Sequence, residues 1–413
     1  MTPPLTRIAA CVFAGLLLAG CGQSASTGTT SSAIAAPSTG YTLGPCNSLP
    51  SVTGAKSSAQ WLNAAAPQIV DPNLVGADVA ASAALPGARF VFVFGDTARV
   101  ADGGATLAVR NSMEIVAGTC AYVVGAPGNR AVVPDRTDGV GYWPMSVLVN
   151  PATGPVTQFT VMMQRVRATG ELEFENLGPA VAVFSVGTDG SPQLDSVTDV
   201  GPDAASRSHP CWGAATYSAT DGYWYLYGTS SPSKPGVFGW AVKVARVPAG
   251  KAADLATWQY WDGKSWSSSE SAAMDLIPAE DGVSQTFSVF SRQGRLYAVS
   301  KKGGYLGDDL AIWPMKSPTG PMESPVTVGL IPNTTNPEQL LYMPLAHPDL
   351  PASKPSQILV SVSRNTTDAA LLAHSPLLYR PFFVEVELPP VASTKNLTPP
   401  KVPVGIPSAS SSS

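Results

Sequence analysis

The chain from residue 89 onward consists of short apolar or alternating runs that are separated by turn residues. Residues 89–95 read Arg-Phe-Val-Phe-Val-Phe-Gly, and turn signals such as Asn150-Pro151 and Asp189-Gly190 separate later runs. This pattern is typical of consecutive antiparallel strands. Further strands are predicted at 107–116, 121–124, 146–149, 159–166 and 180–186. A helical period is sustained only around residues 58–66, so the fold is predicted to be all-β.

A similar segment recurs three times in the second half of the chain, at residues 221–230, 293–301 and 356–364. Each segment reads as a turn that leads into a strand, with one strand before it and another after it. Together with the strand groups around 90–124 and 143–197, they make five units of three or four strands. Radial repetition of such sheets predicts a five-bladed β-propeller. A pair of β-sandwiches is the alternative, but it does not explain the recurring unit.

The N-terminus has the features of an export signal. Arg7 precedes an apolar run at residues 8–18, which is shorter than the ~20 residues of a membrane span. The sequence Leu18-Ala19-Gly20-Cys21 resembles the bacterial lipobox, in which the signal is cut before the cysteine and the thiol carries a lipid. We therefore expect a mature protein that is tethered to the extracytoplasmic face of the membrane through Cys21. A buried first helix is the alternative.

These features divide the chain into four parts. We expect a signal peptide at residues 1–20, a flexible tether at 21–46, the propeller domain at 47–390 and a disordered Pro/Ser-rich tail at 391–413. Within the domain, residues 47–84 are expected to be ordered and to close the last blade.

Composition narrows the function classes. Charged residues make up 13% of the chain, against roughly 25% in an average soluble domain, and there are 38 Gly and 39 Pro. The net charge of −4 comes without a basic stripe, which argues against nucleic acid as a partner. We expect a monomer that binds a neutral ligand such as a cell-wall polysaccharide.

Five cysteines are present, of which Cys11 leaves with the signal and Cys21 carries the lipid. Cys46, Cys120 and Cys211 remain for one bridge in an oxidising compartment. We favour Cys120 with Cys211, because both flank strand-like core segments, and Cys46 is the competing partner. The chain has three His and no zinc-site spacing, so no metal or other cofactor is expected. A structural divalent cation on the propeller axis is the alternative.

Polar residues at the start of each unit are the candidates for chemistry, because the innermost strands of all the blades of a propeller converge on its axis. Asp96 follows the most apolar strand, and it is either a turn cap or a site acid. Residues 110–114, Arg-Asn-Ser-Met-Glu, are a polar cluster in an apolar strand, and they face either a channel or the solvent. Further candidates are Trp143, residues 209–213, Asp308, Asp309, His347, Arg364 and Asn365.

Several of these segments carry a family resemblance. They are residues 94–97, 110–112, 342–348, 361–365 and 379–389. Across residues 85–390 they resemble the DUF4185 and DUF5005 families of actinobacterial secreted proteins. The resemblance implies a five-bladed propeller similar to glycoside hydrolases that cleave arabinofuranosides, and some DUF4185 members are endo-D-arabinanases. The lipobox and composition are also similar to those of mycobacterial lipoproteins.

Glycosidic hydrolysis needs a carboxylic acid to protonate the leaving oxygen and a second carboxylate to activate water or attack carbon. We assign Asp96 as base or nucleophile, with Glu114 and Asp309 as competing acids. Sugar hydroxyls would be held by Arg110, Asn111 and Asn365, and sugar rings would stack on Trp143, Trp212 or Trp313. His347 is a further substrate-binding candidate.

The sequence leaves two other classes of function open, because fold does not dictate function. One is a catalytically inactive carbohydrate-binding or scaffold lipoprotein. The other is a sensor or adhesion partner of envelope proteins.

Overall fold

The computed structural model describes residues 33–34, 40–51, 55–100, 106–152, 154, 156–170, 173–232, 234–336 and 338–390. The predicted signal peptide, Cys21 and the C-terminal tail lie outside these residues. In the described part of the chain, no helix has the length and apolar character that a membrane crossing requires.

Antiparallel strands are the predominant regular structure of the described residues, so the all-β prediction is confirmed. The strands form five larger sheets and one of three short strands. The first sheet contains β5 (Ala81–Leu85), β6 (Arg89–Phe94), β9 (Ser112–Ala117), β10 (Cys120–Gly125), β2 (Thr42–Leu43) and β3 (Asn47–Ser48). The second contains β11 (Gly141–Val149), β12 (Gln158–Ala168), β13 (Phe174–Val186), β14 (Pro192–Asp199) and β1 (Ala33–Ile34).

The recurring sequence unit corresponds to the next three sheets. The third sheet contains β15 (Cys211–Ser218), β16 (Tyr223–Ser230), β17 (Ala241–Pro248), β18 (Gln259–Trp261) and β19 (Trp266–Ser267). The fourth contains β20 (Ser288–Arg292), β21 (Arg295–Lys301), β22 (Asp309–Met315) and β23 (Val326–Leu330). The fifth contains β24 (Thr334–Thr335), β25 (Glu338–Ala346), β26 (Gln357–Asn365) and β27 (Phe382–Glu387). The three similar segments are thus β16, β21 and β26.

The small sheet contains β4 (Gly76–Ala77), β7 (Thr97–Val100) and β8 (Thr106–Val109). Its presence corrects the prediction of one strand over 107–116. The strand is interrupted at Arg110 and Asn111, and its two halves join different sheets. The Asn111 amide explains the break, because it leaves the strand to bond the backbone of Val133 and Tyr142.

Helices are short. In the described part of the chain they are α2 (Ser58–Ala65), α3 (Ala369–His374) and single 3₁₀ turns at Ala66–Gln68, Pro127–Asn129, Leu255–Thr257, Glu270–Ala272, Ala279–Asp281, Gly304–Leu306 and Pro376–Tyr379. The predicted helix at 58–66 is therefore confirmed as α2. It is capped by the Ser57 side chain, which accepts a hydrogen bond from the Gln60 backbone.

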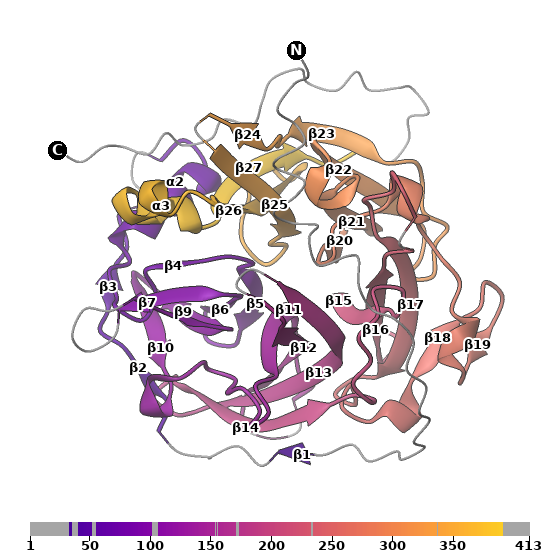
Figure 1. The fold of residues 1–413 in the computed structure, drawn as a ribbon, viewed down its shortest axis with the longest axis horizontal. Coiled ribbons are helices and arrows are strands. Elements are labelled where there is room, and N and C mark those ends of the chain that lie inside the picture. The colour runs from indigo at the N-terminus through magenta and orange to yellow at the C-terminus, as the bar shows by residue number, and fades with distance from the viewer. Residues whose placement is uncertain are drawn as a thin grey trace.

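The five larger sheets surround a common centre (Figure 1). One strand of each sheet packs against one strand of the next, β5 against β11, β11 against β15, β15 against β20 and β20 against β25. Buried side chains fill each junction, and Leu359 and Phe383 of the fifth sheet pack with Ala80 and Phe92 at the start of the first. The arrangement is that of a β-propeller.

Polar contacts between the fifth sheet and the segment before the first sheet close the ring. Arg380, which precedes β27, donates hydrogen bonds to the backbone carbonyls of Ala66, Ile69, Leu74 and Val75. The α2 residue Asn63 bonds both the N–H and the carbonyl of Phe383. Asn63 and the carbonyls of residues 66–75, which belong to the segment expected to close the last blade, thus bond residues of and just before β27.

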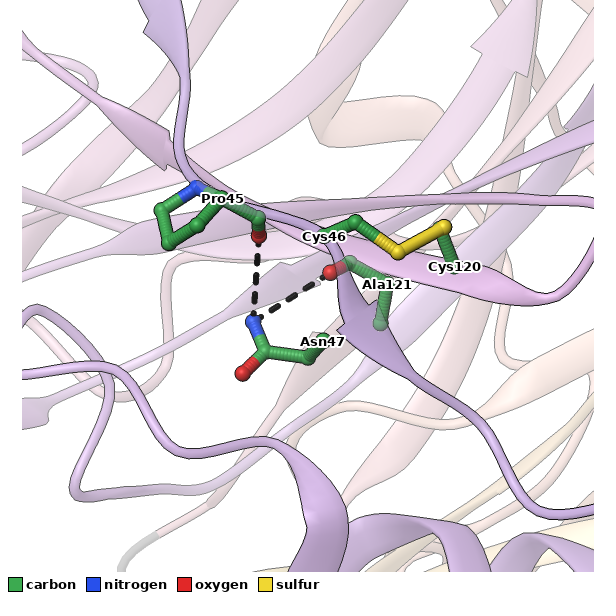
Figure 2. The surroundings of a disulfide bond; sticks show 5 residues. All are labelled: Pro45, Cys46, Asn47, Cys120 and Ala121. Atoms are coloured by element: carbon green, nitrogen blue, oxygen red, sulfur yellow. Dashed lines mark hydrogen bonds between the residues drawn. A yellow bond between two sulfur atoms is a disulfide. The ribbon is translucent and has the colours of Figure 1, made fainter.

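The disulfide joins Cys46 to Cys120, so the predicted pairing of Cys120 with Cys211 is wrong (Figure 2). Within residues 42–48, the short strands β2 and β3 each pair with β10. The prediction had placed residues 21–46 in a flexible tether. Asn47 fixes this contact with hydrogen bonds to Pro45 and Ala121. Cys211 is buried at the start of β15, where its thiol contacts Gln164.

Removal of this bridge is predicted to destabilise the domain. Cys46→Ser and Cys120→Ser should each lower the free energy of unfolding by about 2–4 kcal/mol, because the bridge closes a loop with a sequence separation of 74. Chemical denaturation measures the change, and the double variant should lose no more than either single variant. Alkylation of the unfolded, unreduced protein at Cys46 or Cys120 instead of Cys211 would contradict the pairing.

Candidate functional site

Two carboxylates meet at one end of the first sheet. Asp78 lies shortly before β5, and Asp96 lies shortly after β6. The Gly95 N–H donates to the Asp78 carbonyl at 3.1 Å. A Cβ on Gly95 would lie 2.3 Å from Asp78 Oδ1, so the carboxyl group packs directly on this glycine. The Gly in the Phe-Gly-Asp-Thr segment is thus required by the close approach of Asp78.

Asp78 is held in an environment that favours its protonated form. Burial and the negative charge of Asp96 raise its pKa to about 7, although hydrogen bonds from Tyr342 and Tyr379 act in the opposite direction. The Tyr342 hydroxyl donates to Asp78 Oδ2 at 2.8 Å. Asp78 therefore has the properties of a carboxylic acid that keeps its proton close to neutral pH.

Asp96 has partners that favour its ionised form. Trp143 Nε1 donates to Asp96 Oδ1 at 2.7 Å, and the Arg110 guanidinium lies 3.6 Å from the same oxygen. Burial raises the pKa of Asp96, and these two contacts oppose that rise. The Tyr379 hydroxyl fixes the backbone by donating to the Asp96 carbonyl at 2.6 Å. The Asp96 side chain is 37% exposed, so a ligand can reach it.

Asp135 is a third carboxylate beside Arg110. Burial and Asp96 raise its pKa, and Arg110 lowers it. A Cβ on Gly141 would lie 2.5 Å from Arg110 Cγ and 2.8 Å from Asp135 Oδ1, which places the two side chains around this glycine. Asn111 positions the loop that carries Asp135. Its side-chain amide donates to the carbonyls of Val133 and Tyr142 and accepts from the Val133 N–H.

The backbone around Asp78 and Tyr342 is strained. Val79 and Ala80 adopt φ values of 68° and 61°, and Met343 has a φ of 43°. Such conformations cost about 1–3 kcal/mol each and are concentrated at functional sites. The Val79 N–H is held by the Ser363 hydroxyl at 3.0 Å. The surrounding sheets thus fix the Asp78 turn in a conformation that a free chain would avoid.

Irregular strand pairing also occurs at the site. The register shifts between Pro144 and Ser146 in β11 and between Tyr342 and Leu345 in β25. Bulges re-aim nearby side chains and are frequent beside active sites. Trp143 and Tyr342, which contact the two carboxylates, lie next to these shifts.

Four predicted site residues meet in this cluster. Asp96, Arg110 and Trp143 are in contact, and the Asn365 side chain hydrogen bonds with Tyr342, the partner of Asp78. Asn111 lies beneath them and is buried, so its role is to position the loop of Asp135.

The two predicted acids lie elsewhere. Glu114 is paired with Phe92, four residues before Asp96, which corresponds to roughly 13 Å along the strand. It is buried and faces an apolar cavity on the side of α2. Asp309 begins β22 of the fourth sheet, where its carbonyl accepts a hydrogen bond from the Lys302 backbone. Neither belongs to the Asp78–Asp96 cluster.

Three other predicted binding residues are in the core. Trp212 is buried against Trp258 and Tyr260, and its Nε1 donates to Glu270. Trp313 is also buried, and His347 is buried with Nδ1 2.7 Å from the Ser82 hydroxyl. Their burial excludes direct contact with a ligand at the cluster in this conformation.

Sequence reasoning missed Asp78 and Asp135, and it gave no role to Tyr342 and Tyr379. Asp78 lies at the start of the first unit, where site residues are expected, but the apolar pattern places the start of this unit at residue 89. The preceding strand β5 reads Ala-Ser-Ala-Ala-Leu, a weak strand signal. A search for carboxylates before Ala-rich strands would have found Asp78.

Metal ligands are not gathered at the site. Within the ranges that the structure describes, no three His, Cys, Asp or Glu side chains are arranged to hold a metal ion. The axial cation stays an untested alternative.

Three solved structures are similar to this one. A structure described as a "putative hydrolase" from Bacteroides ovatus is similar with a TM-score of 0.58 and 19% identity, covering 75% of this chain and 85% of that chain. A GH43 enzyme from Xanthomonas citri in complex with xylotriose has a TM-score of 0.39 and 13% identity, with coverages of 71% and 84%. A GH43 β-xylosidase/α-arabinofuranosidase from a compost metagenome has a TM-score of 0.39 and 9% identity, with coverages of 77% and 93%.

Comparison with curated proteins finds no match to the sequence. The model of the family described as "Domain of unknown function (DUF5005)" matches residues 70–388, a range that includes Asp78, Asp96 and the closing strand β27. This match spans most of the chain, and it confirms the resemblance to DUF5005 seen in the sequence motifs. The protein belongs to the DUF5005 family.

Proposed function

We propose that this protein is a glycoside hydrolase that cleaves arabinofuranose-containing polysaccharide of the cell envelope. The proposal depends on one observation, the proximity of two partly buried carboxylates. The charge of Asp96 helps to raise the pKa of Asp78, while Trp143 and Arg110 offset part of the rise that burial causes in the pKa of Asp96. Pairs of titratable groups whose surroundings drive their pKa values apart are typical of acid and base assignments. A solvent-accessible Asp96 beside Arg110 and Trp143 provides a surface for a sugar.

In the proposed reaction, protonated Asp78 donates its proton to the leaving glycosidic oxygen as the C–O bond breaks. Asp96 either removes a proton from the attacking water or attacks the anomeric carbon itself. Trp143 and Arg110 stabilise the negative charge of Asp96, and the proposal places the proton of the pair on Asp78, whose pKa is raised to about 7. Tyr342 orients Asp78 through its hydrogen bond to Oδ2.

The five larger sheets are the blades of a five-bladed propeller in this proposal. The packing of β5, β11, β15, β20 and β25 side by side supports it. The cluster would then lie at the axis, where the first strands of the blades approach one another.

Substrate class and location rest on the sequence. The resemblance to DUF4185 endo-D-arabinanases supports an arabinofuranose substrate, and the lipobox at Leu18–Cys21 supports a lipid anchor at the membrane. The description of the similar Bacteroides ovatus protein as a hydrolase is consistent with the reaction class.

Asp96→Asn is expected to lower kcat/KM for arabinan by about 100- to 10,000-fold while leaving arabinan binding intact. The amide keeps the hydrogen bond from Trp143 but cannot act as a base or nucleophile. Oligosaccharide profiling of arabinan and arabinogalactan digests measures products, and Asp309→Asn is the matched control that should retain activity. Binding of arabinan by the wild-type protein without products would instead support a carbohydrate-binding lipoprotein.

The pH dependence of kcat/KM is expected to fall as pH rises through about 7, because Asp78 must be protonated to donate. Asp78→Asn should remove most activity together with this limb of the profile. Tyr342→Phe should move the limb to higher pH, because the Tyr342 hydrogen bond lowers the pKa of Asp78. An unchanged limb in both variants would exclude Asp78 as the acid.

A further inference from the structure

A separate cavity of about 320 Å³ lies between α2 and the first and fifth sheets. Its wall is almost wholly apolar and includes Trp61, Leu62, Phe90 and Phe383. An engineered cavity of about 150 Å³ with a similar lining is known to bind benzene, so this volume is sufficient for a larger apolar molecule.

The deep end of this cavity contains a carboxyl group. Glu114 lines the cavity and is 4% exposed, and within the described residues its Oε2 has no hydrogen-bond partner. Buried polar atoms are nearly always paired, because an unpaired one carries its full desolvation cost. A ligand atom that hydrogen bonds to Oε2 would remove this cost.

The cationic side chain that lines the cavity already has hydrogen-bond partners. Arg380 lines the cavity, but its nitrogens donate to the carbonyls of Ala66, Ile69, Leu74 and Val75. It therefore has little capacity to bind a ligand carboxylate. Burial and the negative charge of Asp71 raise the pKa of Glu114 to about 7, and the positive charge of Arg380 acts in the opposite direction.

The lining of the cavity extends to exposed residues. Glu114, Val116 and Gly118 follow one face of β9 and its turn, and all three line the cavity. Gly118 and Ala88 are exposed turn residues at the other end, which lies roughly 13 Å from Glu114 along the strand. A narrow molecule can enter there and place its polar end at Glu114.

We propose that this cavity binds a single-chain aliphatic alcohol, with the alkyl chain along the apolar wall and the hydroxyl on Glu114. A hydroxyl can donate to the carboxylate and accept from the carboxylic acid, so it satisfies Glu114 in either form. An acid headgroup would meet charge repulsion from ionised Glu114. The site is independent of the Asp78–Asp96 cluster and of the proposed hydrolysis.

Calorimetric titration with 1-octanol tests the site in the full chain. Glu114→Leu should weaken binding by about tenfold, and Glu114→Gln should stay within about threefold of wild type because the amide can pair with a hydroxyl. Val116→Trp should abolish binding by filling the cavity. Leu107→Trp, at an exposed strand residue outside the cavity lining, should bind as wild type does.

The outcomes are distinct. No binding of 1-octanol by the wild type, or equal binding by wild type and Val116→Trp, would overturn the site. Equal affinity of Glu114→Leu and wild type, or tighter binding of octanoate than of 1-octanol, would overturn the assignment to an alcohol. Unfolding curves of each variant establish that the protein is folded in every titration.

Discussion

Closure of the ring by Arg380 is the constraint on which the rest of the structure depends. Its guanidinium binds four backbone carbonyls between residues 66 and 75, and so ties the last sheet to the segment before the first. A buried cation is costly unless its donors are paired, and here the pairing also satisfies carbonyls outside regular strands. The same closure brings Asp78, from the start of the domain, against Tyr342 and Tyr379 from its end. A site composed of both chain ends cannot form before the ring is complete.

The site then follows from packing at the junction of the first and fifth sheets. Gly95 leaves space for the Asp78 carboxyl, and the strained Val79–Ala80 turn directs it there. Two carboxylates in one partly buried place cannot both ionise easily, and their partners decide which one keeps the proton. Trp143 and Arg110 favour charge on Asp96. Strained backbone and perturbed carboxyl pKa values thus occur together at this cluster, as the proposed function requires.

The sequence predicted more of the fold than of the site. Alternating apolar and polar residues and the recurring segments identified β16, β21 and β26. A strand with one buried face has an apolar residue at every second position, so this signal is local in the sequence. Asp96 was found for the same reason, as the polar end of an apolar strand. Asp78 was missed because β5 is rich in Ala, and Glu114 was misassigned because the sequence does not show which side of a sheet faces α2. The predicted disulfide pairing was also wrong, because the pairing of β2 and β3 with β10 is a long-range contact that local sequence does not show.

The central claim is that Asp78 and Asp96 form one coupled pair with the proton on Asp78. The most direct measurement is a pH titration of the side-chain carboxyl carbons by ¹³C NMR, with Asp78→Asn and Asp96→Asn used for assignment. The account predicts that the Asp78 signal titrates near pH 7 and that its midpoint falls in Asp96→Asn, because the neighbouring charge is gone. Independent titration of both groups near pH 4, unaffected by either substitution, would contradict it.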